Sequence, residues 1–398
     1  MHPNELFDVI FRWAHLIAGI MWIGNSMLFN WLDRNLEKHH QLSRLSQGKL
    51  FMVHSGAFYD VEKKLLEPGD LPEPLHWFKW QNFATWATGL SLLVVVYYMR
   101  GGLVNPSVYE MNDGVAVTLS ISSLFTGWII YDGLWRTIGE KNPRFATALS
   151  VAMLFGAIFG FCKVFDGRAA FIQTGVLIGT LMTGNVWLCI MPSQRALVAA
   201  TKSGKDQDPT LSLRAKQRSI HNNYLTFGLL FIMVSNHFGA AITAYLNWLV
   251  LIMVIVGGAG VRYFMNLRYL GEGAQRAVGA WLVPAAMSAG VAMVGLLGIT
   301  QIAKPGVHID YAVNFSRAQE IIVKRCQQCH SSHPTDDVFK SAPNGVMMDT
   351  AAQIVQLAPK IRERAVVGTM MPYLNKTHIT DIERAELGAW IDAGAVVK

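Results

Sequence analysis

The chain has 398 residues, of which 52% are hydrophobic and only 15% are charged. Soluble domains carry about 25% charged residues, so the composition excludes an ordinary water-soluble protein. The formal net charge of +7 does not indicate a nucleic-acid partner, because the positive side chains gather in loops between long apolar segments. The composition therefore predicts a multi-pass membrane protein whose surroundings are the lipid bilayer.

Eight apolar segments are long enough to cross a bilayer as helices, which takes about 20 residues each. They lack the polar stripe that a water-exposed helix shows at a period of 3.6 residues. The expected spans are 6–32, 80–99, 114–135, 144–162, 169–192, 222–241, 245–261 and 278–300. The fold class is therefore expected to be all-α, with an eight-helix transmembrane bundle over residues 1–300.

The distribution of Lys and Arg predicts the orientation of this bundle. Nineteen of them lie in loops 33–79, 136–144, 193–220 and 262–277, and three lie in the loops that alternate with these. Cytoplasmic loops carry the excess of positive residues, so both the N-terminus and the chain after Thr300 are expected outside the cytoplasm. Loop 33–79 is expected to form an amphipathic surface helix with a turn-rich return, and 193–220 a solvated basic loop.

A short motif after the last span carries specific chemistry. The run RCQQCH places Cys326, Cys329 and His330 in the C-x-x-C-H pattern of covalent haem attachment. Two thiols three residues apart can bond one edge of the porphyrin, and the adjacent imidazole can then bind the iron. A zinc site would need further ligands, for which this region offers only His333 and His378. The motif therefore predicts one covalent haem c.

The second axial ligand of that haem is expected downstream of the motif. Met371, which Pro372 holds in an extended backbone, is the predicted thioether ligand. Met370 is the nearest alternative, and Met347 and Met348 are weaker ones. Residues from Thr380 onward predict a terminal helix with an N-cap and an apolar stripe. After a linker at 301–314, residues 315–398 thus resemble a small class I cytochrome c domain.

Histidines within or beside the apolar segments are the candidates for membrane chemistry, because ionisable groups at membrane depth are costly. The predicted catalytic residues are His15, His237, His54 and His221, while His76 is interpreted as an interfacial anchor. These histidines are expected either to act on a substrate or to bind a second, non-covalent haem b. The alternative is that each only hydrogen-bonds a neighbouring helix.

The chain has no G-x-G-x-x-G, P-loop or G-x-S-x-G motif, so neither a nicotinamide nor a flavin site is predicted. Several segments carry a resemblance to a known family: FRWAHLIAGIMWIGNSMLFNWLD, MVHSGAFY, LHWFKWQNFATW, HNNYLTFGLLFIMVSNHF, RCQQCHSSHPTDD and MMPY. From about residue 5 to the end, the chain is similar to bacterial membrane-bound urate oxidases fused to a C-terminal cytochrome c.

The resemblance implies oxidation of urate to 5-hydroxyisourate, with water as the oxygen source. Electrons would pass to the attached haem and on to a soluble cytochrome c or a terminal oxidase. It also implies a location in the bacterial inner membrane, with the cytochrome domain in the periplasm. Urate is a planar anion, for which Arg12 or Arg262, the tryptophans and a neutral histidine are the candidate contacts. The alternative function is a haem-bearing electron-transfer subunit with a quinol or protein donor and no substrate site.

Overall fold

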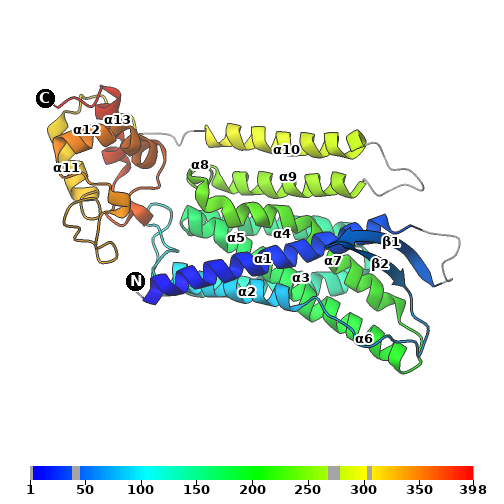
Figure 1. Cartoon of the computed structure of the whole chain (residues 1–398). Helices are drawn as coiled ribbons and strands as arrows, with labels where there is room; N and C mark the ends of the chain where they lie inside the picture. The colour runs from blue at the N-terminus through cyan, green and yellow to red at the C-terminus, as the bar shows by residue number, and fades with distance from the viewer. Residues whose placement is uncertain (1–2, 38–44, 268–277, 303–306, 398) are drawn as a thin grey trace.

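The computed structural model describes residues 3–37, 45–267, 278–302 and 307–397. The chain forms a bundle of long helices with a small helical C-terminal domain (residues 307–397) at one end (Figure 1). We call the bundle end that contacts this domain the near end. The far end carries a β-hairpin and α6 (Figure 1).

The helices follow one another along the bundle with few other elements between them. In chain order they are α1 (Pro3–Asn35), α2 (Trp80–Leu92), η1 (Leu93–Tyr98), α3 (Asp113–Lys141), α4 (Pro143–Val164), α5 (Gly167–Gly184), η2 (Asn185–Ile190), α6 (Met191–Lys202), α7 (Pro209–Val234), η3 (Ser235–His237), α8 (Gly239–Ile242), α9 (Asn247–Leu267) and α10 (Val278–Thr300). The C-terminal domain contains α11 (Phe315–Arg325), η4 (Pro343–Gly345), α12 (Ala351–Ile361), η5 (Arg362–Val367), η6 (Tyr373–Asn375) and α13 (Asp381–Asp392).

Six helices among the described residues are long and apolar enough to cross a membrane. They are Leu6–Asn35, Asp113–Lys141, Pro143–Val164, Gly167–Lys202, Asn247–Leu267 and Ala280–Thr300. The predicted spans 80–99 and 222–241 are not among them. The first region is helical through α2 and η1, up to Tyr98, and the second lies partly in α7, which ends at Val234. Large apolar side chains cover the outside of the bundle, as in Trp13 and Val294, which are 68% and 70% exposed. A protein surface of this kind suits contact with lipid.

The prediction of a surface helix in segment 33–79 is wrong. Strands β1 (Ser46–His54) and β2 (Ala57–Lys64) form an antiparallel hairpin there. Ser55 and Gly56 both have positive φ angles, of 53° and 76°, which the tight two-residue hairpin turn requires. The Ser-Gly pair between two runs of apolar and aromatic residues was the sequence signal for this hairpin.

The prediction of a solvated loop at 193–220 is also wrong. Helix α6 continues the path of α5 and η2 to Lys202, and α7 begins at Pro209. Asp208 caps α7, because its side chain accepts a hydrogen bond from the backbone N–H of Thr210 at 2.8 Å. The proline at the first helical position also favours a helix start, so α7 begins well before the apolar segment that was predicted as a span.

The bundle core and the C-terminal core are separate clusters of buried side chains. Phe165, Phe171 and Leu251 are among the fully buried residues of the bundle. At the α9–α10 contact the backbones approach closely over small residues: a side chain at Gly257 would collide with Ala292, and one at Gly260 with Ser288. Small residues allow such close packing of membrane helices.

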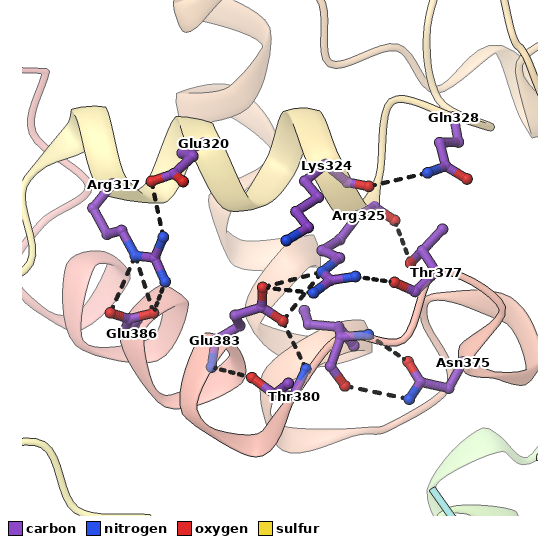
Figure 2. Close-up of polar contacts among 11 residues, drawn as sticks. Arg317, Glu320, Lys324, Arg325, Gln328, Asn375, Thr377, Thr380, Glu383 and Glu386 are labelled. Atoms are coloured by element: carbon purple, nitrogen blue, oxygen red, sulfur yellow. Dashed lines mark hydrogen bonds and ion pairs between the residues drawn. The ribbon is translucent and has the colours of Figure 1, made fainter. Parts of the chain in front are cut away.

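Helices α11 and α13 pack together in the C-terminal domain around Ile322, Leu387 and Trp390. Two ion pairs join these helices at the edge of that core (Figure 2). Arg325 binds Glu383 at 2.9 Å with both side chains largely buried, and Arg317 binds Glu386 at 2.9 Å. Glu383 also accepts from the N–H of Thr380 at 2.7 Å, which completes a capping box at the start of α13.

The C-terminal domain touches the near end of the bundle through the loop before α13. Asn375 donates a hydrogen bond from Nδ2 to Ser107 Oγ at 2.5 Å. The thioether of Met370 lies over Gly239 at the start of α8, where any side chain would collide with it. These contacts place the segment 370–375 directly against the helix bundle.

We expect Gly257→Leu to lower the free energy of unfolding by about 1–3 kcal/mol, because overpacking displaces α10 from α9. Gly290→Leu is the matched control, since a side chain at Gly290 meets nothing within 4 Å. Thermal unfolding of the purified protein in detergent measures both. Equal melting temperatures for the two variants would contradict this packing.

We expect Glu383→Gln to destabilise the C-terminal domain by about 3 kcal/mol, because it leaves Arg325 without its buried carboxylate. Burial alone would raise the pKa of Glu383, but hydrogen bonds from Thr380 and Arg325 hold that pKa below its ordinary value. The stabilisation by the ionised Glu383 is therefore fully present above the ordinary pKa of Glu. It is lost as the pH falls through the lowered pKa of Glu383 in the folded domain.

Hydrogen exchange of the α11 and α13 amides in the full chain measures this effect. Glu320→Gln is the control, because Glu320 pairs with Arg317 on an exposed surface, where an ion pair contributes little. The same change in protection for both variants would count against the assigned role of Glu383.

Candidate functional site

The C-x-x-C-H motif begins where α11 ends. Cys326 packs against the C-terminal core, and the N–H groups of Cys329 and His330 both donate to its carbonyl, at 3.2 and 2.9 Å. The motif therefore forms a tight turn that brings both thiols and the imidazole to one region. His330 donates from Nδ1 to the carbonyl of Val346 at 3.0 Å, which leaves Nε2 as the nitrogen able to bind a metal. Ligating histidines usually carry such a hydrogen bond on their other nitrogen.

The two predicted methionine candidates lie in different surroundings. Met371 packs against the C-terminal core, as Cys326 does. Its backbone is held by two hydrogen bonds, one from its N–H to Arg364 O at 2.9 Å and one from Arg384 Nη1 to its carbonyl at 2.8 Å. Met370 instead lies over Gly239 of the bundle. Met348 is buried in the C-terminal core, while Met347 is exposed. The arrangement favours Met371 over Met370 as the side chain that faces the interior of the domain.

A buried polar cluster lies in the far half of the bundle, between α3, η2 and α7. We call Arg218, Asp132, Asn185, Tyr131 and His221 the Arg218 cluster. Arg218 is 1% exposed and binds Asp132 at 2.7 Å and Asn185 Oδ1 at 3.4 Å. Asn185 donates to the hydroxyl of Tyr131 at 3.0 Å, and that hydroxyl lies 2.7 Å from His221 Nδ1. The π-helical turn η2 starts at Asn185, and such turns are frequent at functional sites.

Three consecutive residues of α7 connect this cluster to a second polar group. His221 faces Tyr131, and Asn222 Oδ1 accepts a hydrogen bond from Asn185 at 2.9 Å. Asn223 points to the other side, where its Oδ1 accepts from Arg262 Nε at 2.8 Å and from Asn266 at 3.2 Å. The run HNN therefore ties α7 to α3 and η2 on one side and to α9 on the other.

A cavity of about 230 Å³ adjoins Arg262, between α1, α9 and α10. Arg262 is only 5% exposed, and its guanidinium also lies 5.6 Å from the ring centre of Phe227. The cavity, which we call the Arg262 cavity, is lined by Met27, Asn30, Trp31, Arg262, Met265, Asn266 and Trp281. It joins a buried cation, amide groups and indole rings in one place.

The structure does not bring the four predicted catalytic histidines together. His15 donates from Nδ1 to the carbonyl of Thr85 at 2.9 Å and so lies between α1 and α2. His221 belongs to the Arg218 cluster. His54 is exposed at the end of β1 beside Ser55, and His237 is exposed in η3 at the near end. The predicted anion contact Arg12 is exposed and pairs with Asp8 at 2.5 Å, whereas Arg262 is buried beside a cavity.

Sequence reasoning missed Arg218 and Asp132 as members of a buried site. Arg218, His221 and Asn222 are spaced at i, i+3 and i+4, which puts them on one face of a helix. That spacing was a usable signal, but it has meaning only if 209–220 is helical, and this segment was predicted as a loop.

One of three comparisons with known proteins found a match. The Urate oxidase N-terminal family matches residues 2–296, which include the whole helix bundle up to the last turn of α10. Neither the comparison with curated proteins nor that with solved structures found a match. The matched region contains both the Arg218 cluster and the Arg262 cavity. A match over this share of the chain shows that the protein belongs to the Urate oxidase N-terminal family.

Proposed function

We propose that this protein oxidises urate to 5-hydroxyisourate in its helix bundle and passes the electrons to a haem c in its C-terminal domain. The observation that carries the proposal is the family match over residues 2–296. A C-x-x-C-H motif in the same chain supports the second half of it. The proposed location is the bacterial inner membrane, with the C-terminal domain in the periplasm.

The overall reaction balances without oxygen as a reactant. Water adds one oxygen atom to the urate anion, and one proton and two electrons leave to give neutral 5-hydroxyisourate. Oxidation of one urate releases two electrons, but a haem accepts only one. The haem of the C-terminal domain must therefore be reduced twice for each urate, or a second carrier must accept the other electron. A soluble cytochrome c or a terminal oxidase is the proposed final acceptor.

The residues of the C-terminal domain fit a covalent haem. Cys326 and Cys329 would form the two thioether bonds, and His330 and Met371 would bind the iron. The hydrogen bond from His330 to Val346 fixes the ring that would bind the metal. When bound, the haem supplies a one-electron acceptor, and its Met ligand raises the reduction potential.

The two ends of the bundle are far apart for electron transfer. Helix α9 starts at Asn247 near the C-terminal domain, and Arg262 is fifteen residues further along it, a rise of about 22 Å at 1.5 Å per residue. Electron transfer slows steeply with distance, so oxidation at the far end calls for an intermediate carrier. We propose a second haem, of the b type, as that carrier. The ring of His15 does not fit as its ligand, because it lies against Gly89 of α2 and its Nδ1 bonds the carbonyl of Thr85.

We expect urate alone to reduce the c-type haem of the oxidised protein under anaerobic conditions, with 5-hydroxyisourate as the product. If the haem c is the sole carrier, half an equivalent of urate per chain should reduce the protein completely. If a haem b is also reduced, complete reduction should take one equivalent. An optical titration measures both the reduction and its stoichiometry.

Xanthine is the control ligand, and a quinol is the control reductant. If the haem stays oxidised with urate but is reduced by the quinol, the result contradicts the proposed oxidation of urate. It would instead favour the alternative of an electron-transfer subunit without a substrate site.

We expect Met371→Ala to keep the covalent haem but to lose the near-infrared band of sulfur-to-iron ligation. The reduction potential should fall, within the roughly 0.8 V range over which axial ligands set haem potentials. Met370→Ala, one residue away, should keep both the band and the potential. Absorption spectra and a redox titration check this, and the reverse pattern would assign the ligand to Met370.

A further inference from the structure

The outer half of the β1–β2 hairpin exposes large apolar side chains. Phe51, Val53 and Phe58 are 64%, 70% and 82% exposed, and Tyr59 is half exposed. The register pairs Val53 with Phe58, and Phe51 lies two residues before Val53, so these three share one face. Tyr59 lies on the other face, because side chains alternate along a strand. We call residues 51–59 the hairpin tip and the paired residues on either side of it the hairpin base.

Charged side chains of the hairpin lie only in its base. The tip contains no Lys, Arg, Asp or Glu. Three ion pairs hold the charges of the base at 2.7, 2.7 and 3.0 Å, namely Lys49–Asp60, Lys63–Asp33 and Lys64–Glu62. Polarity therefore changes along the length of the hairpin, whereas a hairpin with one face packed on protein alternates between apolar and polar residues.

The base is fixed to the end of a membrane-length helix at the far end of the bundle (Figure 1). Glu37 exchanges two backbone hydrogen bonds with Lys49, both at 3.0 Å, and a side chain at Gly48 would collide with Leu36. The pairing of Glu37 with Lys49 is antiparallel, so β1 runs back against the direction in which the chain leaves α1. The span Leu6–Asn35 ends at this point, which puts the base at the membrane boundary and directs the tip toward the bilayer.

The tip needs a surface to cover it, because a two-stranded hairpin by itself is only marginally stable in water. Within the described ranges, protein covers only the base: Leu50 is buried, while no residue of β2 is. No residue of the tip belongs to a buried cluster. Lipid can cover both faces at once, and interfacial elements bury their apolar side chains about 5–10 Å into the boundary between headgroups and acyl chains.

We propose that the hairpin tip inserts into the headgroup region of the lipid leaflet at the far end of the bundle, with Val53 and Phe58 as its anchoring side chains. This insertion rests on the proposed membrane location and does not depend on the oxidation of urate. The lysines of the base then lie at the water boundary, where positive side chains meet anionic lipid phosphates. His54, which was predicted as a catalytic residue, lies instead at the turn of an interfacial anchor.

Spin labels on single cysteines measure the depth of the tip in the full-length protein. The protein is held in nanodiscs of phosphatidylethanolamine and phosphatidylglycerol, in which both membrane faces are open. Oxygen concentrates in lipid and a water-soluble nickel chelate stays in water, so the ratio of their collisions with the label reports its depth. Phe58→Cys and Val53→Cys carry the label at the tip, and Lys64→Cys carries it at the base.

Two further positions calibrate the scale. Val294→Cys, on the exposed face of α10, is the lipid reference. Asp70→Cys, in the exposed loop after β2, is the water reference. The unmodified protein gives the background from the four cysteines that the chain already contains. Size-exclusion profiles show that each variant is folded.

We expect the oxygen-to-nickel ratio at Phe58 and Val53 to exceed that at Asp70 severalfold and to approach that at Val294. The ratio should fall toward the base, so that Lys64 gives an intermediate value. A tip label that behaves like the label at Asp70 overturns the insertion, because the tip then lies in water.

Two other results also count against the insertion. If neither oxygen nor nickel reaches the tip label, protein covers the tip, as in contact with a second copy of the chain, and lipid does not. If the label at Val294 itself behaves as in water, the proposed membrane location is wrong and the insertion falls with it. A water-like label at Phe58 beside a lipid-like label at Val294 overturns the insertion alone.

Discussion

The ion pair between Arg218 and Asp132 is the interaction on which the far half of the bundle depends. A charge this deep in an apolar helix bundle is tolerated only when a partner neutralises it. Asp132 supplies that partner from α3. Asn185 accepts a hydrogen bond from Arg218, and the ring of Tyr131 lies beside the guanidinium. The pair thereby fixes the rotation of α7 relative to α3, since a turn of either helix would separate the two charges.

That fixed rotation also decides what the other face of α7 presents. Asn222 and Asn223 are neighbours in sequence, so the helix points them about 100° apart. With Asn222 held against η2, Asn223 is directed to α9, where it receives the hydrogen bond of Arg262. The Arg218 cluster therefore supports the geometry of the Arg262 cavity although its own residues do not line that cavity.

Sequence patterns predicted the apolar helices better than their polar surroundings. Length and hydrophobicity suffice to locate a helix such as α4 or α10, because lipid leaves a chain few other ways to satisfy its backbone. The hairpin β1–β2 and the helix α6 were missed, since both lie in segments where polar and apolar residues mix and hydropathy carries little information. The Ser-Gly turn and the capping Asp208 were present in the sequence but are short-range signals.

The candidate site was predicted only in part, for a related reason. The motif around Cys326 has its candidate ligands in adjacent residues, so spacing alone is enough to propose a haem there. The Arg218 cluster is assembled from Asp132, Asn185 and Arg218, which are distant in sequence. No local spacing therefore predicts that they lie together. Depth alone selected the histidines, yet His54 and His237 are exposed, and His15 has a partner on α2 that its own segment does not reveal.

The loop that carries Met370 and Met371 links the proposed haem site to the bundle. The two side chains are consecutive and lie in opposite surroundings, Met371 against the domain core and Met370 over Gly239. Gly239 has to lack a side chain for this contact, and Asn375 adds a hydrogen bond to Ser107 from the same loop. A shift of the C-terminal domain away from the near end would therefore pull on the backbone beside the proposed iron ligand. Docking of the domain and the proposed ligation of a haem thus both involve one short segment.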